Sequence, residues 1–133
     1  MSLHFTDASR SLGESAVYIT TTLPYINAKP HVGFAMEFVR ADVLARYAHL
    51  RGREVFFNTG TDEHGQKIYE SAKEKGVEVQ EYCDGLAEEY KKLIPLLGVS
   101  GDVHFIRTTD AHHIKAAQHF WKLVDENGYI EKR

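Results

Sequence analysis

Residues 23–34 read LPYINAKPHVGF and join two segments of different character. The segment before them, residues 17–22, reads VYITTT, an apolar and β-branched run typical of a strand. From Val32 onward, apolar residues recur at three- and four-residue spacing, as on one face of a helix: Ala35, Met36, Val39, Val43, Tyr47 and Leu50. The pattern predicts a strand that ends in a loop, which brings His31 and Gly33 to the start of a helix.

The start of such a helix is suited to binding an anion. The first backbone N–H groups of a helix have no partner within it, and the positive end of the helix dipole lies there. His31 could donate hydrogen bonds to phosphate oxygens, and Gly33 has no side chain to keep a base or a ribose away from the backbone. Alternatively, His31 is only a capping or surface histidine that follows Pro30.

The rest of the chain continues the alternation of strands and helices. Further strands are predicted at residues 54–58 and 103–107, in addition to a buried strand at 16–22. Helices are predicted from Val32 to a glycine cap at position 52, and over 66–75, 79–97 and from Thr109 or Asp110 to Gly128. This order predicts an α/β fold, a Rossmann-like parallel sheet with flanking helices. Residues 1–15 are expected to form a flexible leader.

A second polar loop, TGTDEHG at residues 59–65, follows the second predicted strand. Ligands of open parallel sheets bind at the carboxyl ends of the strands, so this loop and residues 22–33 are expected at one edge. The carboxylate of Asp62 could hold a substrate ammonium group. Two other interpretations remain open, a metal site formed with Glu63 and His64, and a solvated turn.

Glu37 lies four residues after Gly33 and therefore on the same side of the predicted helix. Its carboxylate could reach a ribose hydroxyl or an amino group of the ligand. It could equally be an acid placed early in the helix because the dipole favours it there.

Composition narrows the function classes. The chain has 133 residues, a formal charge of −3 and a single cysteine, Cys83, so an internal disulfide and a multi-thiolate zinc site are both excluded. No apolar run approaches the roughly 20 residues that span a bilayer, so no membrane partner is expected. The acidic balance argues against a nucleic-acid-binding surface on this chain. The single thiol and the polar first residues fit a cytoplasmic location.

Several blocks of sequence carry a resemblance to a known family. The segment Pro30-His31-Val32-Gly33, after residues 23–28, resembles the nucleotide-binding signature of class I aminoacyl-tRNA synthetases, and within them the methionyl-tRNA synthetase family. The blocks ADVLARY at 41–47, GTDEHGQKI at 60–68 and RTTD at 107–110 are also similar to that family. The likeness extends from about Val17 to Tyr129.

This resemblance implies an enzyme that activates methionine with ATP to methionyl-adenylate and then transfers it to methionine tRNA. It implies that His31 and Gly33 bind ATP and that His31 is the catalytic residue that stabilises the transition state. From its position on the predicted helix, Glu37 is assigned to the same ATP site. Leu23 and Tyr25 would line the methionine pocket. Asp62 would hold the ammonium group.

One position departs from the family pattern. Phe34 stands where the family has its second histidine, so one donor to the phosphates is replaced by a ring that could pack against the adenine side of the ATP site.

The resemblance also implies how much of the enzyme this chain holds. Residues 16–133 would form the N-terminal part of a catalytic domain, without the Lys-Met-Ser-Lys-Ser loop, the zinc knuckle and the anticodon-binding domain. ATP would enter as a substrate with Mg²⁺, zinc would bind only in the downstream region, and tRNA would bind mainly outside this chain. The chain alone is expected to be inactive. The alternatives are another class I synthetase or nucleotidyltransferase, and a binding fragment without catalysis.

Overall fold

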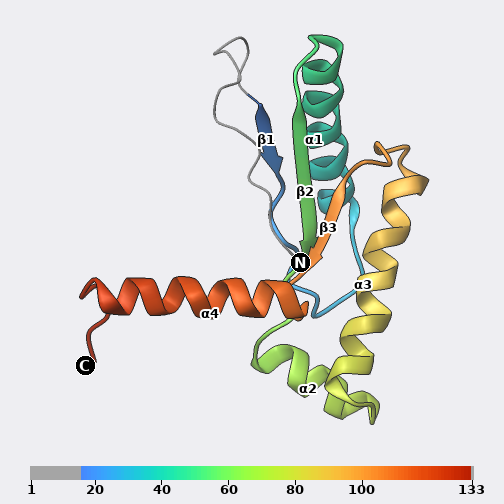
Figure 1. The fold of residues 1–133 in the computed structure, drawn as a ribbon. Helices are drawn as coiled ribbons and strands as arrows, with labels where there is room; N and C mark the ends of the chain where they lie inside the picture. Colours follow the sequence, from blue (N-terminus) through green and yellow to red (C-terminus); the bar gives the residue numbers. More distant parts are fainter. Residues whose placement is uncertain (1–15, 133) are drawn as a thin grey trace.

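The fold alternates parallel strands with helices, as the sequence predicts (Figure 1). A computed structural model describes residues 16–132, so the predicted leader at 1–15 lies outside the described residues. The elements follow in this order: β1 (Val17–Thr20), α1 (Val32–Leu50), β2 (Val55–Thr61), α2 (Gln66–Lys75), α3 (Val79–Leu96), β3 (His104–Arg107) and α4 (Ala111–Glu126). The predicted α/β class with a parallel sheet and flanking helices is confirmed.

The sheet has the strand order β1-β2-β3, and both pairs are parallel. Val17 pairs with Val55 at one end of the β1–β2 ladder, and Thr20 pairs with Asn58 at the other. The prediction that residues 16–22 form a buried strand is wrong in extent and in burial. β1 has four residues, which alternate between half-buried and exposed, because it is an edge strand with one uncovered face.

β2 is longer than predicted and includes the first residues of the polar segment at 59–65. Thr59, Gly60 and Thr61 pair with the successive residues of β3, so they belong to the ladder and not to the loop. A Cβ atom at Gly60 would lie 1.8 Å from the carbonyl oxygen of Ile106. Only glycine allows the two strands to approach this closely. The loop after β2 therefore begins at Asp62.

The hydrophobic core lies between one face of the sheet and helices α1, α2 and α3. It contains Phe57 from β2, Phe38 from α1, Ile68 from α2 and Tyr90 from α3. The apolar residues from which the helix at 32–50 was predicted are mostly exposed, including Met36, Val39, Val43, Tyr47 and Leu50. The buried face of α1 carries small residues and one acid instead: Phe38, Ala41, Asp42, Ala45 and Ala48.

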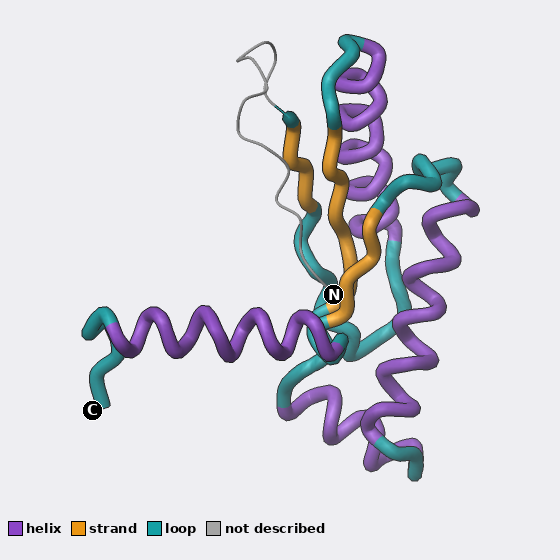
Figure 2. Tube along the Cα trace, in the orientation of Figure 1, coloured by secondary structure: helices purple, strands orange, loops and turns teal. Residues whose placement is uncertain are grey.

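The other face of the sheet is uncovered by the described residues. Tyr18 and Phe56 stack with their ring centroids 5.5 Å apart, and Phe56 stacks on His104 at 4.2 Å. Helix α4 projects away from the sheet and the other helices (Figure 2). None of its residues is buried. Parallel sheets are normally covered on both faces, so this face is unusual for its class. Within residues 16–132, no helix has the length and apolar character that crossing a bilayer requires.

Asp42 ties α1 to the loop between α3 and β3. Its Oδ1 atom accepts hydrogen bonds from the backbone N–H of Ser100 at 2.9 Å and from the Ser100 hydroxyl at 2.5 Å. Its Oδ2 atom accepts from Nε of Arg46 at 2.6 Å. Burial alone would raise the pKa of Asp42, but the bonds from Ser100 and Arg46 lower it below its usual value.

The lowered pKa of Asp42 predicts a loss of stability in acid. A carboxyl group whose pKa is lower in the folded state stabilises that state above its unfolded pKa of about 3.9, and this contribution is lost as the pH falls through the folded value. We expect Asp42→Asn to lower the free energy of unfolding at neutral pH and to flatten its decline below about pH 4. Urea denaturation across pH measures both effects. Asp125→Asn, a change to an exposed acid on α4, is the control, and an unchanged acid limb in Asp42→Asn would contradict the assignment.

Candidate functional site

Main-chain hydrogen bonds join the two candidate loops at the carboxyl edge of the sheet. The N–H of Asp62 donates to the carbonyl of Pro24 at 2.8 Å, and the N–H of Ile26 donates to the carbonyl of Asp62 at 3.2 Å. These bonds form a parallel bridge between Tyr25 and Asp62, beyond the paired ends of β1 and β2. The expectation that both loops lie at the same edge is confirmed. Leu23 is half-buried in the first of these loops.

His31 caps α1 and has a defined tautomer. Its backbone is extended, and its Nδ1 atom accepts a hydrogen bond from the N–H of Gly33 at 3.1 Å. Because Nδ1 is the acceptor, the neutral imidazole carries its proton on Nε2. His31 is therefore a capping histidine, one of the two interpretations of the sequence. The same cap gives it a proton donor at an exposed position.

A side chain at position 33 would displace the His31 ring. A Cβ atom there would lie 2.8 Å from Cε1 and 2.9 Å from Nδ1 of His31. Any other residue would push the imidazole away from the helix start and weaken the cap. Gly33 thus leaves room for the ring of His31 at the start of α1.

Phe34 packs on His31 and on helix α3. Its ring centroid lies 4.3 Å from that of His31, and it meets the ring of Tyr90 edge-on at 5.6 Å. Stacking of this kind restricts the orientation of both rings. Helix α3 also holds the preceding loop, because the hydroxyl of Tyr82 donates to the carbonyl of Asn27 at 3.1 Å. The residue in place of a second histidine therefore supports the first one.

Glu37 is bound to the end of the first strand. Its two carboxylate oxygens accept hydrogen bonds from the N–H and the hydroxyl of Thr22, both at 2.8 Å. It does not lie in the first turn of α1, so the interpretation as a first-turn acid is wrong. Glu37 instead fixes the segment that leads from β1 into residues 23–34.

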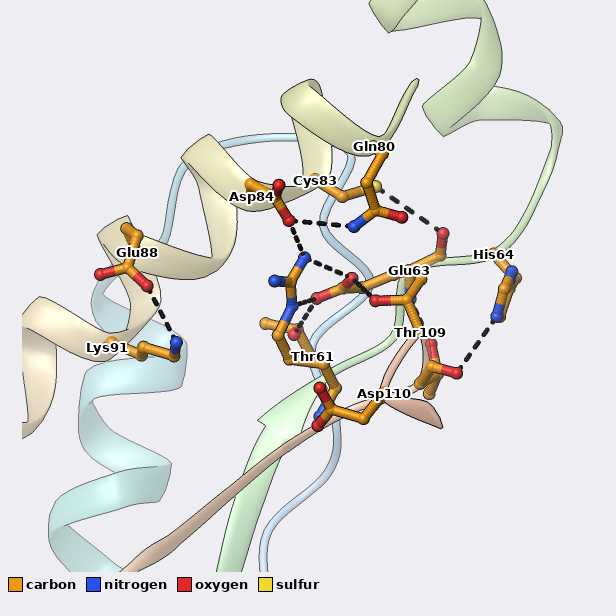
Figure 3. A network of polar contacts seen from close by, with 12 residues as sticks. Thr61, Glu63, His64, Gln80, Cys83, Asp84, Glu88, Lys91, Thr109 and Asp110 are labelled. Atoms are coloured by element: carbon orange, nitrogen blue, oxygen red, sulfur yellow. Dashed lines mark hydrogen bonds and ion pairs between the residues drawn. The ribbon is translucent and has the colours of Figure 1, made fainter. Parts of the chain in front are cut away.

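Glu63 is the most enclosed acid of the site, and sequence reasoning missed its role (Figure 3). Its side chain is fully buried and binds Arg107 through two bonds, from Nε at 2.7 Å and from a terminal nitrogen at 2.8 Å. The hydroxyls of Thr61 and Thr109 donate to the same carboxylate at 2.6 Å and 2.5 Å. Four donors thus satisfy one carboxylate, and Arg107 also reaches Asp84 of α3 at 2.6 Å.

The polar residues of the second loop do not form one cluster. Glu63 is turned into the protein, whereas Asp62 is half-buried and His64 is exposed beside the carbonyl of Thr108, 3.3 Å from Nε2. Among residues 16–132, no three His, Cys, Asp or Glu side chains form a group that could hold a metal ion. Arg107 ends a predicted strand at the same edge of the sheet. This position was the one feature of the sequence from which its ion pair with Glu63 could have been predicted.

The hydrogen bonds of this network stabilise the charged forms of Arg107 and Asp84. Hydrogen bonding to Glu63 raises the pKa of Arg107, which stays charged. Hydrogen bonds from Gln80 and Arg107 lower the pKa of Asp84. Burial raises the pKa of the Cys83 thiol, which donates to the carbonyl of Glu63 at 3.8 Å. Cys83 is therefore a neutral, packed side chain beside the network.

The parallel sheet with helices on one face places the chain in the class of Rossmann-like α/β proteins, in the form that class I synthetases have. The family model described as tRNA synthetases class I (M) matches residues 17–133, and the chain belongs to this family.

Individual relatives that match this chain are methionine–tRNA ligases. The methionine–tRNA ligase of Thermotoga maritima is 48% identical over 115 residues, which are 86% of this chain and 18% of that protein. The methionine–tRNA ligase of Rhizobium meliloti is 46% identical over 118 residues, which cover 89% of this chain and 23% of the relative.

A solved structure also matches. The Mycobacterium tuberculosis methionyl-tRNA synthetase bound by methionyl-adenylate superposes with a TM-score of 0.82 at 38% identity, over 86% of this chain and 22% of that one. The chain thus spans about a fifth of the length of the relatives it matches.

The burial of Glu63 predicts a large cost for removing its charge. We expect Glu63→Gln to lower the free energy of unfolding by about 3–5 kcal/mol, because Arg107 loses its buried charged partner and keeps only the exposed Asp84. Urea denaturation followed by circular dichroism measures this. Glu88→Gln, which breaks an exposed pair with Lys91 on α3, should leave the midpoint nearly unchanged. Equal midpoints for the two variants would contradict the role of Glu63.

Proposed function

We propose that this chain is the N-terminal part of the catalytic domain of a methionine–tRNA ligase. The complete enzyme would join methionine to ATP, giving methionyl-adenylate and pyrophosphate, and would then transfer the methionyl group to methionine tRNA. The observation that carries the proposal is the Tyr25–Asp62 bridge, which brings the loop of His31 and the loop of Asp62 to one edge of the sheet. Family membership supports the same reaction.

His31 is assigned to the transition state of the first step. A methionine carboxylate oxygen attacks the α-phosphorus, and the bond to the bridging oxygen breaks as pyrophosphate leaves. Negative charge builds on the phosphate oxygens during this exchange. Because Nδ1 of His31 accepts the bond from Gly33, Nε2–H is available as a donor to such an oxygen, beside the N-terminus of α1.

The methionine pocket is assigned to Leu23, Tyr25 and Asp62. The side chains of Leu23 and Tyr25 supply apolar and aromatic surface that suits a thioether. The carboxylate of Asp62 would accept the ammonium group of methionine. The Tyr25 hydroxyl lies close to the second loop, since a Cβ atom on Gly65 would be 2.6 Å from its oxygen.

Glu37 and Phe34 complete the proposed ATP site. The oxygens of Glu37 already accept from Thr22, and each keeps a second lone pair for a ribose hydroxyl. Phe34 would contact the adenine side with the part of its ring that His31 and Tyr90 leave open.

Other components belong to the whole enzyme. Mg²⁺ would arrive with ATP on its phosphates, and zinc and most tRNA contacts would lie in the portion of the relatives beyond the matched segment. The uncovered face of the sheet, with Tyr18 and Phe56, supports a larger catalytic domain that packs there. We place this enzyme in the cytoplasm, where a buried free thiol such as Cys83 persists.

Amino-acid dependence tests the substrate. In a chimera in which residues 17–133 replace the matching segment of the Thermotoga maritima relative, we expect ATP–pyrophosphate exchange that requires methionine. The 133-residue chain alone should show negligible exchange. Exchange that leucine, cysteine or valine supports equally well would instead favour another class I synthetase. Robust exchange by the chain alone would contradict the assignment as one part of the site.

Substitution of His31 tests the transition-state role. In the same chimera, His31→Ala should lower kcat for exchange on the order of 10²-fold or more, because one donor to the developing charge is removed. His112→Ala, which changes an exposed histidine on α4, is the matched control and should leave the rate unchanged. Full activity in His31→Ala would show that His31 caps α1 and does not stabilise the transition state.

A further inference from the structure

Within residues 16–132, no side-chain contact of Asp62 explains how its carboxylate is held, but its main chain is fixed from both sides. On one side lie its bonds to Pro24 and Ile26. On the other side, the N–H of Glu63 donates to the hydroxyl of Thr108 at 2.8 Å, in addition to the bonds of the Glu63 carboxylate. A shift of Glu63 would therefore be transmitted directly to the neighbouring Asp62.

The partner of Glu63 connects this loop to two other elements. Arg107 is the last residue of β3, and its guanidinium reaches Glu63 in the second loop and Asp84 on α3. The same helix α3 holds the first loop, through the bond of Tyr82 to the carbonyl of Asn27. Arg107 thus lies where β3, the loop of Asp62 and the helix that supports the loop of His31 come together.

The form of the ion pair fixes orientation as well as distance. Two parallel bonds from a planar guanidinium to both carboxylate oxygens allow one arrangement of the two groups, whereas an ammonium group would act as a single point charge. A buried pair of this kind is weak support for stability in itself, because desolvation offsets much of the attraction. The fixed orientation of the guanidinium and the carboxylate is the property by which such a pair could position a binding loop.

We propose that Arg107 and Glu63 are positioning residues, whose two-bonded ion pair sets the main chain at Asp62 so that the Asp62 carboxylate meets the ammonium group of the amino-acid substrate. This inference rests on the proposed function, since it requires that Asp62 binds that ammonium group. Neither Arg107 nor Glu63 touches the substrate in this arrangement. Their effect on catalysis passes through Asp62.

The ammonium group is equally charged in the bound substrate and in the transition state. A loosened Asp62 therefore weakens both by the same factor, which raises KM and leaves kcat unchanged. We expect Arg107→Lys, which keeps the positive charge but loses the two-bonded geometry, to raise KM for methionine by about tenfold. In the same enzyme, kcat and KM for ATP should stay within about twofold of the unsubstituted values.

The experiment uses the active chimera that carries residues 17–133, with pyrophosphate exchange as the readout. The variants are Arg107→Lys, Asp62→Asn, the double variant and the control Glu88→Gln. If Arg107 acts through Asp62, the double variant has the same KM for methionine as Asp62→Asn alone, whereas independent effects would multiply. Glu88→Gln should match the unsubstituted chimera.

A ligand without the amino group separates positioning from general damage. The inhibition constant of 4-(methylthio)butanoate, which keeps the thioether and the carboxylate, should be the same with and without Arg107→Lys. Multiplying effects in the double variant, a large fall in kcat or an equal loss of affinity for this analogue would overturn the inference. If Arg107→Lys lowers the melting temperature severely, the analogue still decides, because a disordered pocket loses both ligands.

Failure of the inference differs from failure of the proposed function. The unsubstituted chimera must show methionine-dependent exchange, and its absence counts against the proposed function before any variant is made. With that activity present, and with Asp62→Asn raising KM for methionine, an unchanged KM in Arg107→Lys counts against the positioning role alone.

Discussion

The rest of the candidate site depends on the buried ion pair between Glu63 and Arg107. A carboxylate with no exposed surface is tolerated only when its charge is matched and its lone pairs are filled, and here one arginine and two threonine hydroxyls do both. Because Arg107 ends β3 and Glu63 follows β2, the pair links the carboxyl ends of two neighbouring strands. The main-chain bridge from Asp62 to Tyr25 then links the loop after β2 to the loop after β1.

Helix α3 supplies the second constraint. It contacts the first loop through the hydroxyls of Tyr82 and Tyr90, and it contacts Arg107 through Asp84. The loop of His31 and the loop of Asp62 are thus held by one helix as well as by each other. On this view, Phe34 has a role other than that of the histidine it replaces, since it joins His31 to the same helix. The contacts of α3 therefore hold the loop of His31 and the loop of Asp62 in a fixed position relative to each other.

Much of this arrangement could be predicted from the sequence, and the failures have physical causes. The strand-to-helix change around residues 23–34, the left-handed glycine after α1 and the common edge of the two loops follow from local patterns and from the topology of parallel sheets. The buried face of α1 could not be read from apolar spacing, because its apolar face is exposed in this chain. The Glu63–Arg107 pair joins residues 44 positions apart, which no local pattern reveals.

The central claim is that the two loops form one site, with His31 and Asp62 on either side of a single ligand. A crystal structure of the active chimera with methionyl-adenylate tests it most directly. The account predicts that Nε2 of His31 lies within hydrogen-bond distance of a phosphate oxygen, that the Asp62 carboxylate contacts the ammonium group, and that the Glu63–Arg107 pair keeps both of its bonds. An adenylate bound away from either residue, or a ligand ammonium group held by Glu63 after the pair has opened, would contradict it.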